Sequence, residues 1–132
     1  MPFDTSEIPD DATILGATLN VTPVSKFTDN IGDYKTVAVY AGTQADPEQL
    51  TTADYDQYGE TILSDVINVA DFTNDTLATF ILNGDGENAI ALDDYTLLTL
   101  RHGNDYTENA PTSSGYNGIK IYTSEETGTG RD

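Results

Sequence analysis

The chain has 132 residues, and its 23 Asp and Glu residues against 5 Lys and Arg give a formal net charge of −18 at pH 7. Nucleic acids are bound through clustered Lys and Arg, so five scattered cations exclude this class of partner. Because there is no Cys, disulfide frameworks, thiolate metal sites and thiol nucleophiles are excluded as well. The length fits one domain over 1–132, with a Gly- and Thr-rich tail at 124–132. Neither membrane insertion nor a signal peptide is expected, since long apolar runs and a basic leader are both missing.

The acidic surface has three explanations that the sequence leaves open. Carboxylates at this density repel one another unless concentrated salt screens them, which favours a source that lives in high salt. Calcium binding and plain solubility also favour acidic surfaces. If salt is the reason, the domain should lose stability as salt is removed.

Alternation of apolar and polar residues predicts a series of short strands. In the first of them and the residues just before it, Leu15, Ala17, Leu19 and Val21 share one face, and Pro23 then weakens any continuation. The predicted strands are ATLNVTPV at 17–24, KTVAVYAG at 35–42, LATFILN at 77–83, YTLLTLR at 95–101 and GIKIYTS at 118–124. We expect the core to consist of Leu19, Val21, Val37, Val39, Phe80, Leu82, Leu98, Leu100, Ile119 and Ile121.

The segments between these strands are rich in Gly, Asn, Asp and Pro, which favour turns. A helix start is expected at Asp46 and Pro47, and a short helical turn at 87–92 that Asn83 or Asp85 caps. No long helical period occurs. The pattern predicts an all-β fold, an antiparallel β-sandwich of jelly-roll type.

Five blocks follow one another along most of the chain: FDTSEIPDDATILGATL, TADYDQYG, TFILNGDG, YTLLTLRHGND and IKIYTSEETGT. In this order the chain resembles the DNRLRE-type β-sandwich modules of large surface, adhesin-like and virion proteins of bacteria, archaea and their viruses. The motifs are scaffold motifs, so the resemblance implies a spacer or attachment unit and names no catalytic group.

The resemblance also implies strands before the first block and after the last that this chain does not contain. A sandwich without them leaves unpaired edges and an uncovered apolar face. One hypothesis is that a strand from a neighbouring subunit or a symmetric interface completes the domain. The alternatives are a trimmed chain, or cover from its own irregular segments, such as 61–72.

Two acidic segments are candidates for Ca²⁺. Asn104, Asp105, Glu108 and Asn109 lie together in one loop and offer the oxygen ligands that Ca²⁺ prefers. The segment NGDGENAIALDD at 83–94 places acidic residues at calcium-loop spacing, but it lacks the central glycine, the final Glu and the flanking helices of an EF-hand. Apart from this possible Ca²⁺, no cofactor is expected.

Two tyrosines are candidates for a carbohydrate site. Tyr106 and Tyr116 lie in the same long loop, beside Asn117, where rings can stack on sugars and amides can bond to hydroxyls. The competing interpretation is ordinary half-buried packing of tyrosine at a sheet end. For DYDQYG at 54–59, packing of an aromatic ring under a loop is favoured over presentation of the carboxylates to a cation.

No catalytic residues are expected. His102 is the only imidazole and follows a predicted strand end, while Ser113 and Ser114 lie in a loop without the GxSxG turn of a hydrolase. The sequence therefore predicts a non-enzymatic structural protein on a virion or an extracellular surface, a homo-oligomer or a partner of other structural subunits. A virion decoration, turret or fibre protein of a virus with a halophilic host is the first expectation. A carbohydrate-binding or adhesin module and a cell-surface filament subunit are the alternatives.

Overall fold

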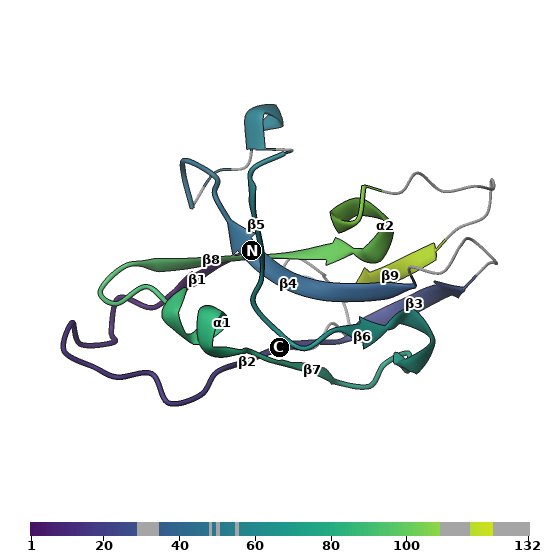
Figure 1. Cartoon of the computed structure of the whole chain (residues 1–132), viewed down its shortest axis with the longest axis horizontal. Helices are drawn as coiled ribbons and strands as arrows, with labels where there is room; N and C mark the ends of the chain where they lie inside the picture. Colours follow the sequence, from purple (N-terminus) through teal and green to yellow (C-terminus); the bar gives the residue numbers. More distant parts are fainter. Residues whose placement is uncertain (29–34, 48, 50, 55, 109–116, 123–132) are drawn as a thin grey trace.

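The computed structural model describes residues 1–28, 35–47, 49, 51–54, 56–108 and 117–122 (Figure 1). The strands are β1 Pro2–Asp4, β2 Thr18–Val21, β3 Pro23–Thr28, β4 Thr36–Gly42, β5 Tyr58–Ile62, β6 Ile67–Asn68, β7 Ala78–Ile81, β8 Tyr95–His102 and β9 Asn117–Ile121. The helical segments are η1 Thr52–Asp54, η2 Val69–Asp71, α1 Gly84–Asn88 and α2 Gly103–Tyr106. All strand pairs are antiparallel. The predicted antiparallel all-β fold is confirmed.

The largest sheet has the strand order β1-β8-β4-β5, and β6 also pairs with β4. The remaining described strands form two separate two-stranded ladders, in which β2 pairs with β7 and β3 pairs with β9. The chain passes from β2 directly into β3 at Pro23 and changes its pairing partner there. The sequence predicts that Pro23 weakens any continuation of the first strand, and in the structure the β2–β7 ladder does end there, while the chain continues as β3 in another ladder.

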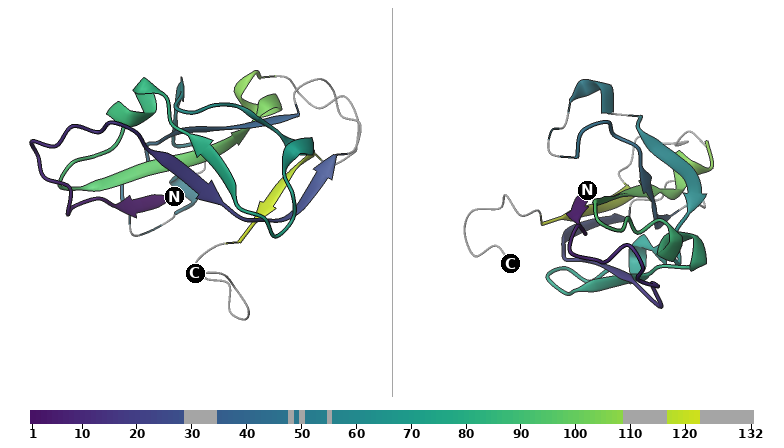
Figure 2. Two further views of the ribbon diagram at one scale, coloured as in Figure 1. Left: turned by 90° about the horizontal axis from the view of Figure 1, so that it is seen from below. Right: turned by 90° about the vertical axis from the view of Figure 1, so that its left-hand side faces the viewer.

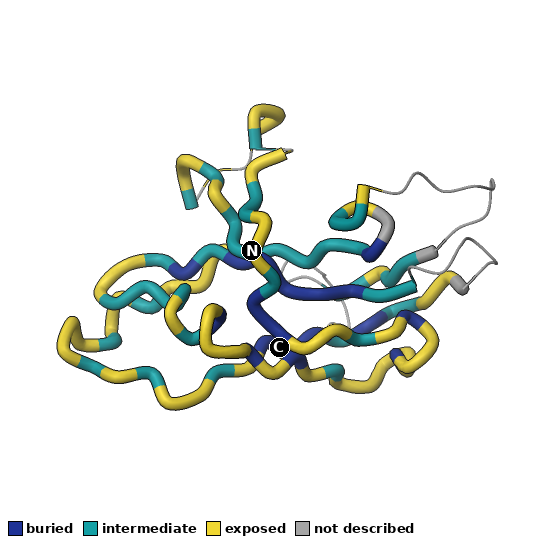
Figure 3. The backbone as a smooth tube through the Cα atoms, viewed as in Figure 1, coloured by how far each residue is buried: buried dark blue, intermediate teal, exposed yellow. Residues whose placement is uncertain are grey.

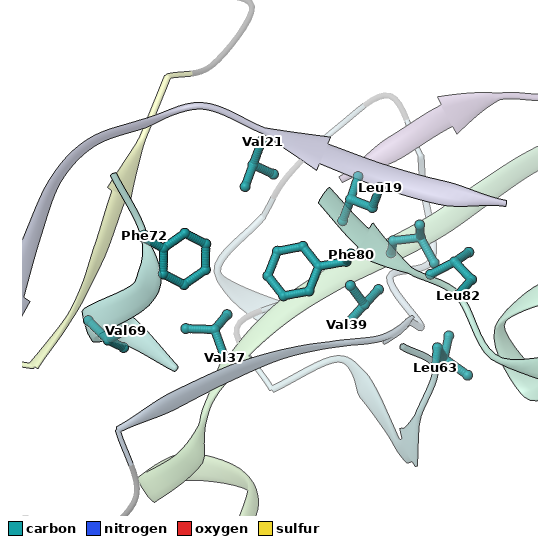
Figure 4. Close-up of a cluster of buried hydrophobic side chains, with 10 residues drawn as sticks. Leu19, Val21, Val37, Val39, Leu63, Val69, Phe72, Phe80 and Leu82 are labelled. Atoms are coloured by element: carbon teal, nitrogen blue, oxygen red, sulfur yellow. The ribbon is translucent and has the colours of Figure 1, made fainter. Parts of the chain in front are cut away.

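The core lies between the inner face of the largest sheet and the β2–β7 ladder (Figures 1 and 2). Phe80 of β7 and Phe72 face each other with ring centroids 6.0 Å apart, and Val37 and Val39 of β4 lie beside them (Figure 4). Seven predicted core residues are buried: Leu19, Val21, Val37, Val39, Phe80, Leu82 and Leu98. Leu100, Ile119 and Ile121 are only partly buried against this cluster, because they line an opening between β8 and β9.

The segment 61–72 supplies Leu63, Ser64, Val69 and Phe72 to the interior. Ser64 Oγ accepts a bond of 3.1 Å from the amide of Val39 and donates one of 2.6 Å to the carbonyl of Asp65, so its burial leaves no unsatisfied hydroxyl. The chain therefore covers part of its own sheet with this segment. The hypothesis that a neighbour's strand completes the domain is not needed for these core positions.

Three sequence predictions are wrong. Leu15 is 90% exposed rather than on the core face, because residues 5–17 form a loop and β2 begins only at Thr18 (Figure 3). No helix starts at Asp46; the nearest helical turn is η1, which Asp54 caps through bonds from the amide and hydroxyl of Thr51. The helical turn expected at 87–92 covers Gly84–Asn88 instead, although Asn83 caps it as predicted by accepting a bond of 2.9 Å from the amide of Gly86.

Candidate functional site

A cluster of polar and aromatic side chains is centred on Arg101, near the end of β8. Arg101 is paired with Ala38 of β4. Because Val37 and Val39 on either side of Ala38 face the core, Arg101 and Ala38 lie on the opposite face of the sheet. The guanidinium carbon is 3.8 Å from the ring centroid of Tyr58 in β5 and 4.9 Å from that of Tyr40 in β4. Its Nε donates a bond of 2.7 Å to the carboxylate of Asp105 in α2. We call Arg101, Tyr40, Tyr58, Tyr106 and Asp105 the arginine cluster.

Tyr106 joins this cluster from α2. Its ring centroid is 5.7 Å from that of Tyr40, and its hydroxyl shares a hydrogen bond of 2.7 Å with the hydroxyl of Thr36. These contacts cover Tyr40, which is only 1% exposed although it points away from the core. The cluster thus explains why β4 is buried on both of its faces.

Burial governs the electrostatics of the cluster. Loss of water raises the pKa of Tyr40 to about 12, and the neighbouring hydroxyl of Tyr106 adds to this effect. Burial also opposes the charge on Arg101, but the hydrogen bond and the charge of Asp105 outweigh it, so the pKa of the guanidinium is raised. Arg101 therefore stays charged at every working pH, and its charge is directed to Asp105 and to two aromatic rings.

The four candidate calcium ligands are not all placed by the structure. Asp105 lies in α2 and is bonded to Arg101, and Glu108 follows α2 as an exposed residue with a positive φ of 54°. Asn104 lies in α2, without a described side chain, and Asn109 lies outside the described residues. Within the part of the chain that the structure describes, no three His, Cys, Asp or Glu side chains gather as a metal site. The calcium site stays a prediction.

The candidate carbohydrate residues are likewise placed in part. Tyr106 is half-buried, and its ring and hydroxyl are used within the arginine cluster. Asn117 is the first residue of β9, and its side chain is not among those described; Tyr116 lies outside the described residues. The described contacts of Tyr106 are those of packing, and the carbohydrate site stays a prediction. Tyr58 is also packed, as expected for DYDQYG.

An open cavity of about 230 Å³ lies where the two layers separate, between β9 and the inner face of β4 and β8. Val37, Leu100, Ile119 and Ile121 give it an apolar lining, and Arg101 and His102 contribute to its wall. It lies at the same end of the molecule as α2 and β3 (Figure 1). We call it the β8–β9 cavity.

Sequence reasoning missed both of these features. The spacing of Arg101 and Asp105 was a signal, because a cation and a carboxylate four residues apart meet when a helical turn joins them. Tyr40 was a second signal, since a large ring on the outward face of a predicted strand needs cover. Nothing in the sequence indicates the β8–β9 cavity. The alternation of apolar and polar residues predicts which face of a strand a side chain lies on, but it does not predict the distance between two layers of strands.

Comparison with protein-family models, with curated proteins and with solved structures finds no match to this chain. Among the residues that the structure describes, no helix is long and apolar enough to cross a membrane.

Proposed function

We propose that this chain is a non-enzymatic structural subunit of an extracellular assembly. More specifically, we propose a jelly-roll subunit that serves as a virion decoration, turret or fibre protein of a virus whose host lives in concentrated salt. The resemblance to DNRLRE-type modules supports the setting, and the net charge of −18 supports the salt environment.

The arginine cluster carries the structural part of this proposal. Arg101, Asp105 and tyrosines are the kinds of groups that bind ligands, yet here Arg101 contacts Asp105 and the rings of Tyr40 and Tyr58, and the hydroxyl of Tyr106 bonds to Thr36. They connect β5, the edge strand of the sheet, and α2 to β4 and β8, which is a scaffold role. A binding site instead directs such groups into a concave surface.

Exposed apolar side chains support a role in an assembly. Leu15, Leu77 and Ile81 are each more than half exposed, and they lie on loops or on the β2–β7 ladder. Apolar surface that remains on a folded subunit is available for contacts with other subunits.

The test is the native mass of the purified chain, measured by light scattering on a sizing column in molar NaCl, with circular dichroism of the same peak. We expect folded oligomers, which electron microscopy of the same sample would show as regular particles or fibres. A folded chain that stays monomeric at every salt and protein concentration would overturn the proposed self-assembling subunit.

A further inference from the structure

The sequence contains the tripeptide pattern Asn-X-Ser/Thr, in which X is not Pro, at two places. They are Asn20-Val21-Thr22 and Asn74-Asp75-Thr76. This pattern is the acceptor for N-linked glycans in secreted proteins, and it is used where it lies at the surface. The structure places the two tripeptides in different surroundings, and these surroundings indicate which of them is an acceptor.

The tripeptide Asn74-Asp75-Thr76 forms an exposed turn between η2 and β7 (Figure 1). Every residue from 73 to 77 is exposed. The hydroxyl of Thr76 donates a long bond of 3.4 Å to the backbone carbonyl of Asn74, so the two groups that define the pattern lie together. Among the contacts that the structure describes, the side-chain amide of Asn74 takes part in no hydrogen bond. Both the amide and the hydroxyl are therefore accessible to an enzyme.

The folded chain holds this turn in place without using the Asn74 side chain. The amide of Asp75 donates a bond of 2.8 Å to the carbonyl of Pro23, and its carboxylate accepts one of 3.2 Å from the hydroxyl of Tyr122. The φ of Asp75 is 59°, which is typical of a tight turn. A sugar on Asn74 would replace none of these contacts, so the fold accommodates a glycan there.

The tripeptide Asn20-Val21-Thr22 lies in a paired strand instead. Asn20 of β2 is paired with Thr79 of β7, whose hydroxyl donates a bond of 2.7 Å to the Asn20 side-chain oxygen. The middle residue, Val21, belongs to the core and is only 7% exposed. A transferase cannot bind this stretch as a separate peptide unless β2 leaves β7. We therefore expect the folded chain to be modified at Asn74 and not at Asn20.

We propose that Asn74 is an N-glycosylation site, with a lipid-linked oligosaccharide as the donor and an oligosaccharyltransferase of the host as the catalyst. In this reaction Nδ2 of Asn74 forms a bond to C1 of the first sugar, and the bond between C1 and the phosphate oxygen of the lipid carrier breaks. The carrier phosphate leaves with the electron pair, and Nδ2 loses one proton to a base of the transferase. This inference rests on the extracellular location in the proposed function, because such transfer acts on exported chains.

The experiment is mass spectrometry of tryptic peptides from the full chain. The chain is fused to an export leader and secreted by a halophilic host whose own surface proteins carry N-glycans. Trypsin cleaves after Lys and Arg, so it releases Asn20 in the peptide that ends at Lys26 and Asn74 in the peptide 36–101. We expect the peptide 36–101 to be heavier by the mass of whole sugar residues, and the peptide that ends at Lys26 to be unmodified.

Substitutions in the turn locate the glycan. Asn74→Gln and Thr76→Ala each destroy the pattern and should abolish the added mass, whereas Thr76→Ser keeps the pattern and should retain it. Thr73→Ala is the matched control, because Thr73 is exposed in the same segment but lies outside the tripeptide. Circular dichroism verifies that each secreted variant is folded.

The outcomes separate this site from the proposed assembly. An unmodified peptide 36–101 in the folded, secreted wild type would overturn the site and leave the assembly standing. Added mass that survives Asn74→Gln, or that occurs on the peptide ending at Lys26 alone, would also overturn it. A chain that is glycosylated at Asn74 but monomeric at every salt and protein concentration would instead overturn the assembly and support the site.

Discussion

Among the glycines whose surroundings the structure describes, Gly86 has the least room for a side chain. A Cβ at this position in α1 would collide with the carbonyl oxygen of Leu63 and lie 2.9 Å from Cβ of Leu82. The obstacle is backbone, so Gly86→Ala must displace α1 from the 61–72 segment, which we expect to cost about 1–3 kcal/mol of unfolding free energy.

Gly84→Ala is the matched control for this prediction. Gly84 lies in the same helical turn, but a Cβ there meets no atom within 4 Å. Alanine favours helix over glycine, so this variant should be neutral or gain up to about 1 kcal/mol. Urea denaturation of both variants decides the matter, and equal stabilities would show that α1 is not packed against Leu63.

Ionisation of Tyr40 should make the free energy of unfolding depend on pH in the alkaline range. Its pKa is raised from 10.0 to about 12 in the folded chain by burial. An unfolded chain therefore loses this proton first, so the stabilisation is complete below pH 10 and is lost as the pH rises toward 12. We expect the urea midpoint to fall across this window, and to fall less in Tyr40→Phe, which has no hydroxyl to ionise. Parallel pH profiles for the two proteins would contradict the burial of this hydroxyl.

Arg101 connects the edge strand β5 and the helical turn α2 to β4 and β8. The planar guanidinium stacks on Tyr58 and Tyr40, which the ammonium of lysine cannot do equally well. Arg101→Lys should therefore cost about 1–2 kcal/mol of unfolding free energy even though the charge is kept.

Asp105→Asn separates the stacking of Arg101 from its ion pair. The Asp105 side chain is half exposed, so the pair contributes at most about 1 kcal/mol, and this variant should be the milder one. Hydrogen exchange should show faster opening of β5 and α2 in Arg101→Lys. A larger loss in Asp105→Asn would mean that the ion pair, and not stacking, holds these elements.

At the scale of elements, the sequence predicts β4, β7, β8 and β9 because each has an apolar face that alternates with polar residues. It does not predict β6 or η2, which are too short to show a period, although Val69 and Phe72 next to them are fully buried. Tertiary contacts place these residues in the core.

The candidate site shows the same limit of sequence reasoning. Because both residues lie in a polar loop, the sequence makes Asp105 a candidate calcium ligand and Tyr106 a candidate carbohydrate-binding residue, with ordinary packing as the competing interpretation for Tyr106. The structure instead turns this stretch into α2 and directs both side chains to residues of β8 and β4. Those partners are distant in sequence for Tyr106, whose bond to Thr36 spans 70 positions. Local composition cannot reveal a contact of this kind.

The distribution of charge belongs to the scale of the whole molecule. The chain carries 18 excess negative charges, and eight carboxylates lie in residues 4–17 and 82–94 without a Lys or Arg among them; we call these two segments the acidic end. Folding brings residues 4–17 and 82–94 together, so the folded state concentrates charge that the unfolded chain keeps apart. Repulsion at this end therefore opposes folding whenever it is not screened.

Salt should therefore stabilise the fold. The Debye length falls from about 10 Å at 0.1 M to about 3 Å at 1 M, so molar NaCl screens carboxylates in neighbouring turns. We expect the melting temperature, measured at dilutions where the chain is monomeric, to rise steadily from millimolar to molar NaCl. A triple variant, Glu7→Gln, Asp10→Asn and Asp11→Asn, removes three exposed charges of the acidic end, so its melting temperature should be higher at low salt and respond less to NaCl. If the wild type melts at the same temperature throughout, repulsion at the acidic end is too weak to matter, and the acidity is not an adaptation of the fold to salt.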